Sequence, residues 1–234
     1  MATSTVRQSP AARRGTRPFE DSFRFLPDNT RRVYDMLSPI YPVSTMLFHS
    51  NAHKVALSLA GVTDGMRVLE VATGSGEMFS RLVRSNPNGA TCGIDISPNM
   101  AARTQRVARN RIPGVKAHCQ ASDSRQMPFR DGSFDAVVCC YLLELLGAED
   151  IVRTLEEMRR VLRPNGKLAL VLTGQQDPAF NVWHKFIAGI APAFLGRLME
   201  TRIPELMDAC EFELEHDQQL RQTWYPSRVV VARR

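Results

Sequence analysis

The stretch MRVLEVATGSGEM, residues 66–78, decides the predicted fold. Val68 to Val71 form a short apolar strand, which runs into a Gly/Ser/Thr turn and then into a helix over 79–84. Open α/β sheets hold nucleotides in this way, because glycine lets the backbone approach the ligand and the helix N-terminus offers unpaired N–H groups. The dinucleotide fingerprint GxGxxG is absent, and Glu70 lies at the end of the strand. A carboxylate there suits a cationic ligand rather than a phosphate.

Strands and helices alternate on the C-terminal side of this turn. Helices are predicted over 98–109 and 149–162, and four further strands over 91–97, 115–122, 131–146 and 168–172. This alternation predicts parallel strands joined by helical crossovers, with both sheet faces covered. Two last strands, 211–220 and 224–233, have no helix between them, which predicts an antiparallel hairpin at the sheet edge.

The net charge of +6 is concentrated at the two ends of the chain of 234 residues. Residues 1–24 carry +3 and the final Arg233 and Arg234 add +2, so residues 25–232 carry only +1. The N-terminal segment is poor in aliphatic side chains, so we expect a solvated, disordered tail there. A transit peptide is the alternative, but the segment shows no amphipathic helical period. The charge therefore gives no strong indication of a nucleic-acid partner.

The cysteines and the apolar runs of the sequence indicate the cellular environment of the protein. Five cysteines without a CxxC spacing are typical of a reduced, cytoplasmic environment. The longest apolar run, near 186–196, is shorter than the roughly 18–20 residues of a membrane-spanning helix, so no such helix is predicted.

Two further acids follow predicted strands. Asp95 ends the second strand, where a carboxylate can accept the hydroxyls of a ribose. Asp123 and Ser124 follow the third strand, where a side-chain acceptor and a backbone amide could read an adenine edge.

Four motifs in order, VLEVATGSGE (68–77), GIDIS (93–97), SDSRQMPFRDGSFDAVV (122–138) and EEMRRVLRPNGKLALV (156–171), resemble the class I S-adenosylmethionine-dependent methyltransferases. The resemblance is greatest to the subgroup of ubiquinone/menaquinone C-methyltransferases and bacterial phospholipid N-methyltransferases. It implies an α/β, Rossmann-like, seven-stranded, mostly parallel sheet with an antiparallel C-terminal edge hairpin and an N-terminal helical cap.

The resemblance also implies roles for single residues. Gly74 and Gly76 would lie under the methionine part of S-adenosylmethionine, Glu70 near its amino group, and Asp95 at the ribose. Ile96 and Met100 would flank the adenine, and Asp123 would bind its amino group. The implied cofactor-binding set is Glu70, Ala72, Thr73, Gly74, Ser75, Gly76, Asp95, Ile96, Met100, Asp123, Ser124 and Cys140.

Two positions depart from the family pattern. Ala72 replaces the first glycine of the turn motif, which narrows the turn. In RVYDMLSPIYPVS (32–44), Pro42 replaces the acid expected after Tyr41.

The predicted organisation has five parts: a basic tail (1–28), a helical cap (29–60), a cofactor-binding core (61–174), an apolar lid (175–200), and a C-terminal helix and hairpin (201–234). The apolar lid favours a hydrophobic small molecule or lipid, such as a quinone precursor, as the substrate. One alternative is phosphatidylethanolamine, with the basic tail resting peripherally on an anionic membrane. Another is RNA, as the substrate of a methyltransferase or the ligand of a non-catalytic relative, although CCYLLELL (139–146) contains no base-flipping motif.

The catalytic base is not identified from the sequence, and the positions to test are Tyr41, Tyr141, Glu144 and His184. His49 and His53 have the i, i+4 spacing of metal ligands, but no acid cluster accompanies them, so we expect structural roles and no metal. Arg103, Arg106 and Arg109 are expected to form a solvated helix face, and the missing GxGxxG disfavours a nicotinamide cofactor.

Overall fold

The computed structural model describes residues 50–174, 203–221 and 226–234. The predicted tail, the lid, the cap before residue 50, Tyr41, His49 and His184 lie outside the described residues. Among the described residues, none of the helices has the length and apolar character needed to cross a membrane.

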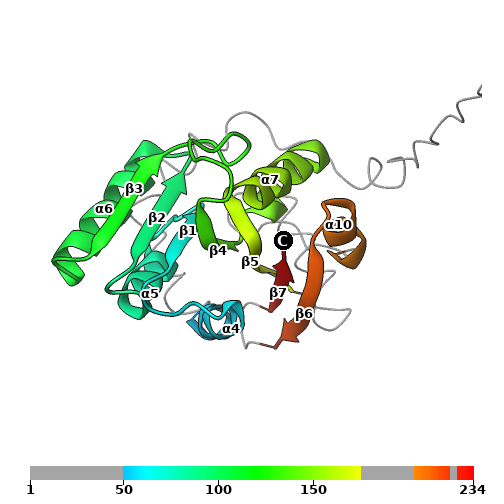
Figure 1. The fold of residues 1–234 in the computed structure, drawn as a ribbon, viewed down its shortest axis with the longest axis horizontal. Helices are drawn as coiled ribbons and strands as arrows, with labels where there is room; N and C mark the ends of the chain where they lie inside the picture. Colours follow the sequence, from blue (N-terminus) through cyan, green and yellow to red (C-terminus); the bar gives the residue numbers. More distant parts are fainter. Residues whose placement is uncertain (1–49, 175–202, 222–225) are drawn as a thin grey trace, which may run out of the picture.

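The described helices and strands follow one another as the alternating pattern predicts (Figure 1). Their bounds are α4 Ser50–Ala60, β1 Arg67–Val71, α5 Glu77–Ser85, β2 Ala90–Asp95, α6 Pro98–Arg111, β3 Lys116–Ala121, β4 Phe134–Cys140, a 3₁₀ turn η1 Leu143–Leu145, α7 Ala148–Val161, β5 Leu162–Thr173, α10 Ile203–Ala209, β6 Glu213–Leu220 and β7 Ser227–Arg233.

The strands form one seven-stranded sheet in the order β3-β2-β1-β4-β5-β7-β6. The five strands from β3 to β5 are parallel, whereas β7 runs antiparallel to both β5 and β6. The chain runs outward from β1 to β3 and then returns to β4 on the other side of β1. Such a reversal opens a crevice at the carboxyl ends of the two central strands, where α/β sheets bind their ligands. The predicted sheet with its edge hairpin is confirmed.

Helices cover both faces of the sheet (Figure 1). On one face, small residues of α4 pack with Met78 and Leu82 of α5 on the valines of the central strands, and α6 packs beside α5. On the other face, Ile151, Leu155 and Met158 of α7 share a core with the apolar side of α10. Two-sided burial explains why residues 168–172 of β5 and 229–232 of β7 are continuously apolar rather than alternating.

The fourth and fifth strands differ from their predicted bounds. The apolar run 131–146 was expected to be one strand, but β4 ends at Cys140 because Tyr141 adopts a φ of 55° and turns the chain into η1. β5 begins at Leu162, six residues before its apolar part, since Leu162 already pairs with Phe134 across a register shift.

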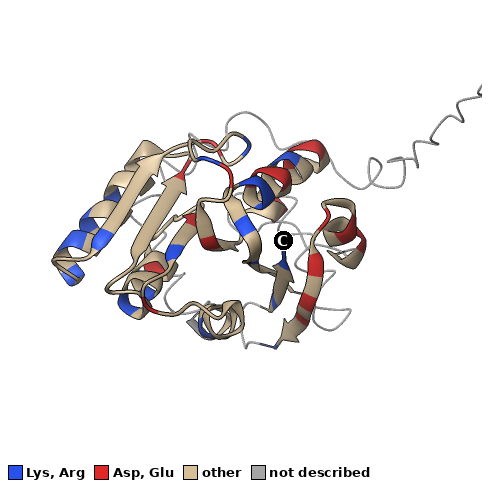
Figure 2. Ribbon diagram, in the orientation of Figure 1, with Lys and Arg blue, Asp and Glu red and all other residues tan. Residues whose placement is uncertain are grey.

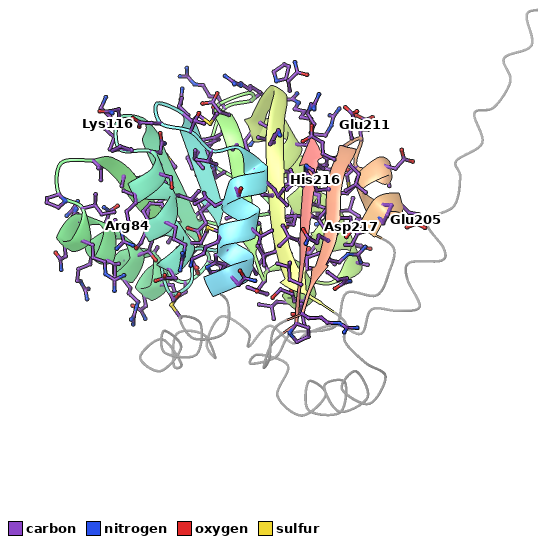
Figure 3. The ribbon with its side chains drawn as sticks, turned by 90° about the horizontal axis from the view of Figure 1, so that it is seen from below. Arg84, Lys116, Glu205, Glu211, His216 and Asp217 are labelled. Carbon is purple, nitrogen blue, oxygen red and sulfur yellow. The ribbon has the colours of Figure 1, made fainter. Side chains whose placement is uncertain are left out.

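Charge is unevenly distributed along the sheet. Figure 2 shows arginines of α6 at one end of the molecule and acids of α10 and β6 at the other. In Figure 3, Arg84 and Lys116 mark the basic end, and Glu205, Glu211 and Asp217 the acidic end. Charged side chains on β6 are consistent with its edge position, because charge on an open edge opposes pairing with another chain.

We expect Gly93→Val to destabilise the fold, because Gly93 of β2 lies directly beneath the turn that follows β1. A Cβ at this position would lie 2.6 Å from Thr73 Cγ2 and 2.8 Å from Cε2 of the buried Phe79. The free energy of unfolding should fall by about 1–3 kcal/mol in urea denaturation. The matched control is Gly147→Ala, where no atom lies within 4 Å of the added Cβ and φ is −72°. This control should lose less than about 1 kcal/mol, because Gly147 is the N-cap of α7 and alanine caps a helix less well than glycine. Equal losses for both variants would contradict the packing argument.

Candidate active site

Glu70 is a carboxylate buried at the end of β1. It is 1% exposed, and its Oε2 has no hydrogen-bond partner among the described residues. Burial, and secondarily the charge of Asp95, raise the pKa of Glu70 well above its usual value. A buried carboxyl without a cation is costly when ionised. A cationic ligand group at this position would offset that cost.

The turn after β1 has an unusual backbone conformation. Ala72, Gly74 and Gly76 have φ values of 61°, 48° and 80°, all in the left-handed region. Thr73 N donates to Ile94 O at 3.1 Å, and Gly76 N donates to Thr73 O at 2.8 Å. Gly76 also has little room, since an added Cβ would lie 3.0 Å from Thr104 Oγ1 of α6. The two glycines therefore let the turn close tightly over the sheet.

Asp95 ties this turn to the next strand. Its Oδ2 accepts from Gly74 N at 2.8 Å and its Oδ1 from Ser97 N at 2.9 Å. The backbone oxygen of Asp95 accepts from Ser122 N at 2.9 Å, beyond the end of β3. The sequence predicted a ribose-binding role for Asp95, but it gave no sign that the same carboxylate holds the turn in place.

The two residues predicted to flank an adenine differ in burial. Ile96 is 48% exposed directly after Asp95, which gives a flat apolar group an accessible side chain to contact. Met100 is 2% exposed and lies in the first turn of α6, where its N–H donates to the capping Ser97 Oγ. The structure therefore places Met100 in the core beneath the site rather than on its open surface.

Asp123 follows β3 and already has a partner. Arg125 donates to both of its carboxylate oxygens, with Nη2 2.7 Å from Oδ2 and Nε 3.0 Å from Oδ1. This pairing with Arg125 lowers the pKa of Asp123. The hydroxyl of the neighbouring Ser124 lies 3.3 Å from Thr154 Oγ1 of α7, so that side chain is directed into the core. Arg125 was not among the residues predicted from the sequence, although its place two residues after Asp123 is a signal for a local ion pair.

The other half of the crevice begins at the end of β4. Cys139 of β4 pairs with Val71 of β1, so Cys140 and Tyr141 lie beside the glycine-rich turn. The Tyr141 hydroxyl lies 2.7 Å from Ser227 Oγ of β7, and its N–H donates to Val171 O at 2.7 Å. Its ring lies 6.3 Å from the buried ring of His53 on α4, centroid to centroid. β7 and α4 therefore contact the aromatic side chain of Tyr141, while β5 holds its backbone.

The remaining sequence candidates have structural contacts. Glu144 is 1% exposed, and its Oε1 accepts from the N–H and the hydroxyl of Thr173, which ties η1 to the end of β5. Arg106 and Arg109 are exposed on α6, and Arg103 is half-buried. In the part of the chain that the structure describes, no three His, Cys, Asp or Glu side chains gather as a metal site.

The following residues thus lie at the carboxyl ends of β1, β2 and β3: Glu70, the turn 72–76, Asp95, Ile96 and Asp123. Beside them lie Cys140, the last residue of β4, and Tyr141, which follows it. The arrangement has buried and half-buried carboxylates, a glycine-rich turn and an exposed apolar side chain. These groups can hold a ligand that combines an ammonium group, a ribose and an adenine.

Comparison with known proteins gives the same assignment. A family model described as "Methyltransferase domain" matches residues 68–166. A 2-phytyl-1,4-naphtoquinone methyltransferase of Nostoc sp. is 28% identical over 163 residues, which span 66% of this chain and 70% of that protein. A ubiquinone/menaquinone biosynthesis C-methyltransferase of Desulfotalea psychrophila is 31% identical over 154 residues, 66% of this chain and 58% of that protein. A demethylmenaquinone methyltransferase of Listeria monocytogenes is 26% identical over 183 residues, 73% of this chain and 75% of that protein.

Solved structures share the fold. A [4+2]-cyclase superposes with a TM-score of 0.71 at 16% identity and covers 91% of this chain and 98% of its own. Magnesium protoporphyrin IX methyltransferase of Synechocystis, solved with bound S-adenosylhomocysteine, gives a TM-score of 0.63 at 17% identity, over 90% of this chain and 89% of its own. The sheet order, the methyltransferase domain over residues 68–166 and the relatives named above together support a class I S-adenosylmethionine-dependent methyltransferase.

Proposed function

We propose that this methyltransferase acts on a hydrophobic small molecule, and specifically on the ring of a reduced quinone precursor. The observation that carries the proposal is the similarity to proteins named for quinone methylation, which extends over 66–73% of this chain. It therefore reaches beyond the cofactor-binding motifs that most methyltransferases share.

The cofactor half of the site would use the residues at the ends of β1, β2 and β3. Glu70 would receive the cofactor ammonium group, which supplies the cation that the buried carboxyl lacks among the described residues. Asp95 would accept the ribose hydroxyls, Ile96 would contact the adenine, and Asp123 would accept from its amino group. Gly74 and Gly76 would let the backbone approach the methionine portion.

When bound, S-adenosylmethionine supplies a methyl group on an already activated sulfonium. The chain's own residues then have to align the acceptor and exclude water. Tyr141 is a hydrogen-bonding group on the acceptor side of the turn, with its hydroxyl 2.7 Å from Oγ of the buried Ser227. A ring hydroxyl of a quinol is a group that Tyr141 can orient. We infer that a peripheral membrane contact is the route by which an apolar substrate arrives.

We expect Gly74→Arg to abolish cofactor binding, because a long cationic side chain would enter the space next to Glu70 and Asp95. The matched control is Gly61→Arg at the end of α4. Both glycines have positive φ, 48° and 64°, and neither has an atom within 4 Å of an added Cβ. Each variant should lose about 1–2 kcal/mol of stability for the left-handed conformation. Only Gly74→Arg should lose S-adenosylhomocysteine binding in calorimetry, and unchanged affinity would contradict the proposed site.

We expect Glu70→Gln to separate stability from binding. The raised pKa of Glu70 means that the folded, cofactor-free protein binds this proton more tightly than the unfolded chain does. Its stabilising contribution is therefore present at low pH and is lost as the pH rises above the usual glutamate value. Thermal melts between about pH 5 and pH 8 should show wild type losing stability relative to Glu70→Gln. The same variant should bind S-adenosylmethionine about tenfold more weakly, since it loses a charge-assisted contact. Parallel melting curves would show that Glu70 does not titrate as described.

A methyl-transfer assay tests the acceptor. The wild-type protein with methyl-labelled S-adenosylmethionine is offered reduced demethylmenaquinone, phosphatidylethanolamine vesicles or tRNA in separate reactions. We expect label in the quinol fraction only, with Gly74→Arg as the inactive control. Label in phosphatidylethanolamine alone, or in tRNA alone, would replace the quinol proposal by the corresponding alternative.

A further inference from the structure

Asp123 and Arg125 form a side-chain clamp on the loop that follows β3. Four hydrogen bonds join the two residues: Arg125 N to Oδ1 at 2.9 Å, Nε to Oδ1 at 3.0 Å, Nε to Oδ2 at 3.1 Å and Nη2 to Oδ2 at 2.7 Å. The remaining terminal nitrogen, Nη1, donates to Asp150 Oδ2 at 3.1 Å. Arg125 therefore holds the carboxylate of Asp123 and is itself anchored to the first turn of α7.

The clamp leaves part of the Asp123 carboxylate available. An ionised carboxylate has about four acceptor positions, two on each oxygen. Arg125 N and Nε occupy the two acceptor positions of Oδ1, and Nη2 occupies one acceptor position of Oδ2. The Nε–H group points mainly to Oδ1, so its longer contact with Oδ2 does not occupy a further position. One acceptor position on Oδ2 therefore remains, and its direction is fixed by the clamp. An amino group can use such a position, whereas a carbonyl oxygen would face a carboxylate oxygen.

Stability alone does not explain this ion pair. The side chains of Arg125 and Asp123 are 40% and 36% exposed, and exposed pairs add little to stability. The clamp also lies directly beside the cofactor half of the site, because Ser122 N, the residue before Asp123, donates to Asp95 O at 2.9 Å.

We propose that Arg125 is a positioning residue that orients the Asp123 carboxylate and so makes the site selective for a 6-aminopurine over a 6-oxopurine. This inference rests on the proposed role of Asp123 as the acceptor for the adenine amino group. Asp150 takes part as the anchor of the Arg125 guanidinium. Arg125 itself needs no contact with the cofactor.

The test compares two ligands that differ only at the purine 6-position, S-adenosylhomocysteine and S-inosylhomocysteine. Calorimetry measures both dissociation constants for wild type, Asp123→Ala, Arg125→Gln and Asp150→Asn. The control is Arg153→Gln, which removes another arginine near the N-terminal end of α7, with a side chain 63% exposed and 3.9 Å from Glu149. We expect Arg125→Gln to weaken S-adenosylhomocysteine binding by about tenfold, as expected when a hydrogen bond to a charged group is lost. Its affinity for S-inosylhomocysteine should change by less than about twofold, since the carbonyl oxygen at the purine 6-position cannot donate to the oriented acceptor.

Each outcome discriminates between the proposals. Asp150→Asn should shift selectivity in the same direction by a smaller factor, and Arg153→Gln should match wild type. If Asp123→Ala loses selectivity but Arg125→Gln keeps it, Asp123 has its proposed role and the inference about Arg125 is wrong. If the wild-type protein binds the two ligands equally well, both the proposed role of Asp123 and the inference about Arg125 are wrong. If Arg125→Gln weakens the binding of both ligands equally, the effect is a general structural one. If Arg125→Gln binds S-adenosylhomocysteine more tightly, Arg125 competes with the ligand for Asp123. Either result overturns the inference.

Discussion

The carboxylate of Asp95 is the interaction on which the cofactor half of the site depends. The two carboxylate oxygens of Asp95 accept hydrogen bonds from the N–H groups of Gly74 and Ser97, and its backbone oxygen accepts one from Ser122. These three donors lie in the loops that follow β1, β2 and β3. Asp95 also lies close enough to Glu70 to raise the pKa of that carboxyl. The resulting site has a negative field and a fixed backbone. Both properties favour a cofactor that carries an ammonium and a sulfonium group.

The order of the sheet separates two tasks. The strands from β3 to β1 end in the acids and the turn proposed to bind the cofactor. On the other side, Tyr141 follows β4, Thr173 ends β5, and Ser227 begins the antiparallel β7. Because the two groups of strands meet at the β1–β4 boundary, the acceptor side can change without disturbing the cofactor side. This separation is consistent with a fold that supports different reactions at similar sheet geometry.

Much of the fold follows from the sequence, because alternation of buried strands with helices is a local signal. The ends of β1, β2 and β3 were predicted within a few residues, and their acids with them. The end of β4 was not predicted, because mostly apolar residues continue through Leu146. Only the backbone conformation of Tyr141 shows that the strand ends at Cys140. The bridging role of Asp95 joins residues 21 positions apart, and no pattern in either segment reveals the other. The Asp123–Arg125 clamp joins residues two positions apart, which the sequence places together. Its anchor, the hydrogen bond from Arg125 to Asp150, joins residues 25 positions apart, which the sequence does not place together.

Ala72 has a consequence for how the site comes into being. An L-residue with a side chain is disfavoured at a φ of 61°, so this turn would not adopt its shape in an isolated peptide. The shape is imposed by hydrogen bonds to Ile94 and Asp95, which are in place only after β2 has paired with β1. The recognition element is therefore a product of the assembled sheet. A transplanted copy of residues 66–78 would carry the motif without its binding conformation.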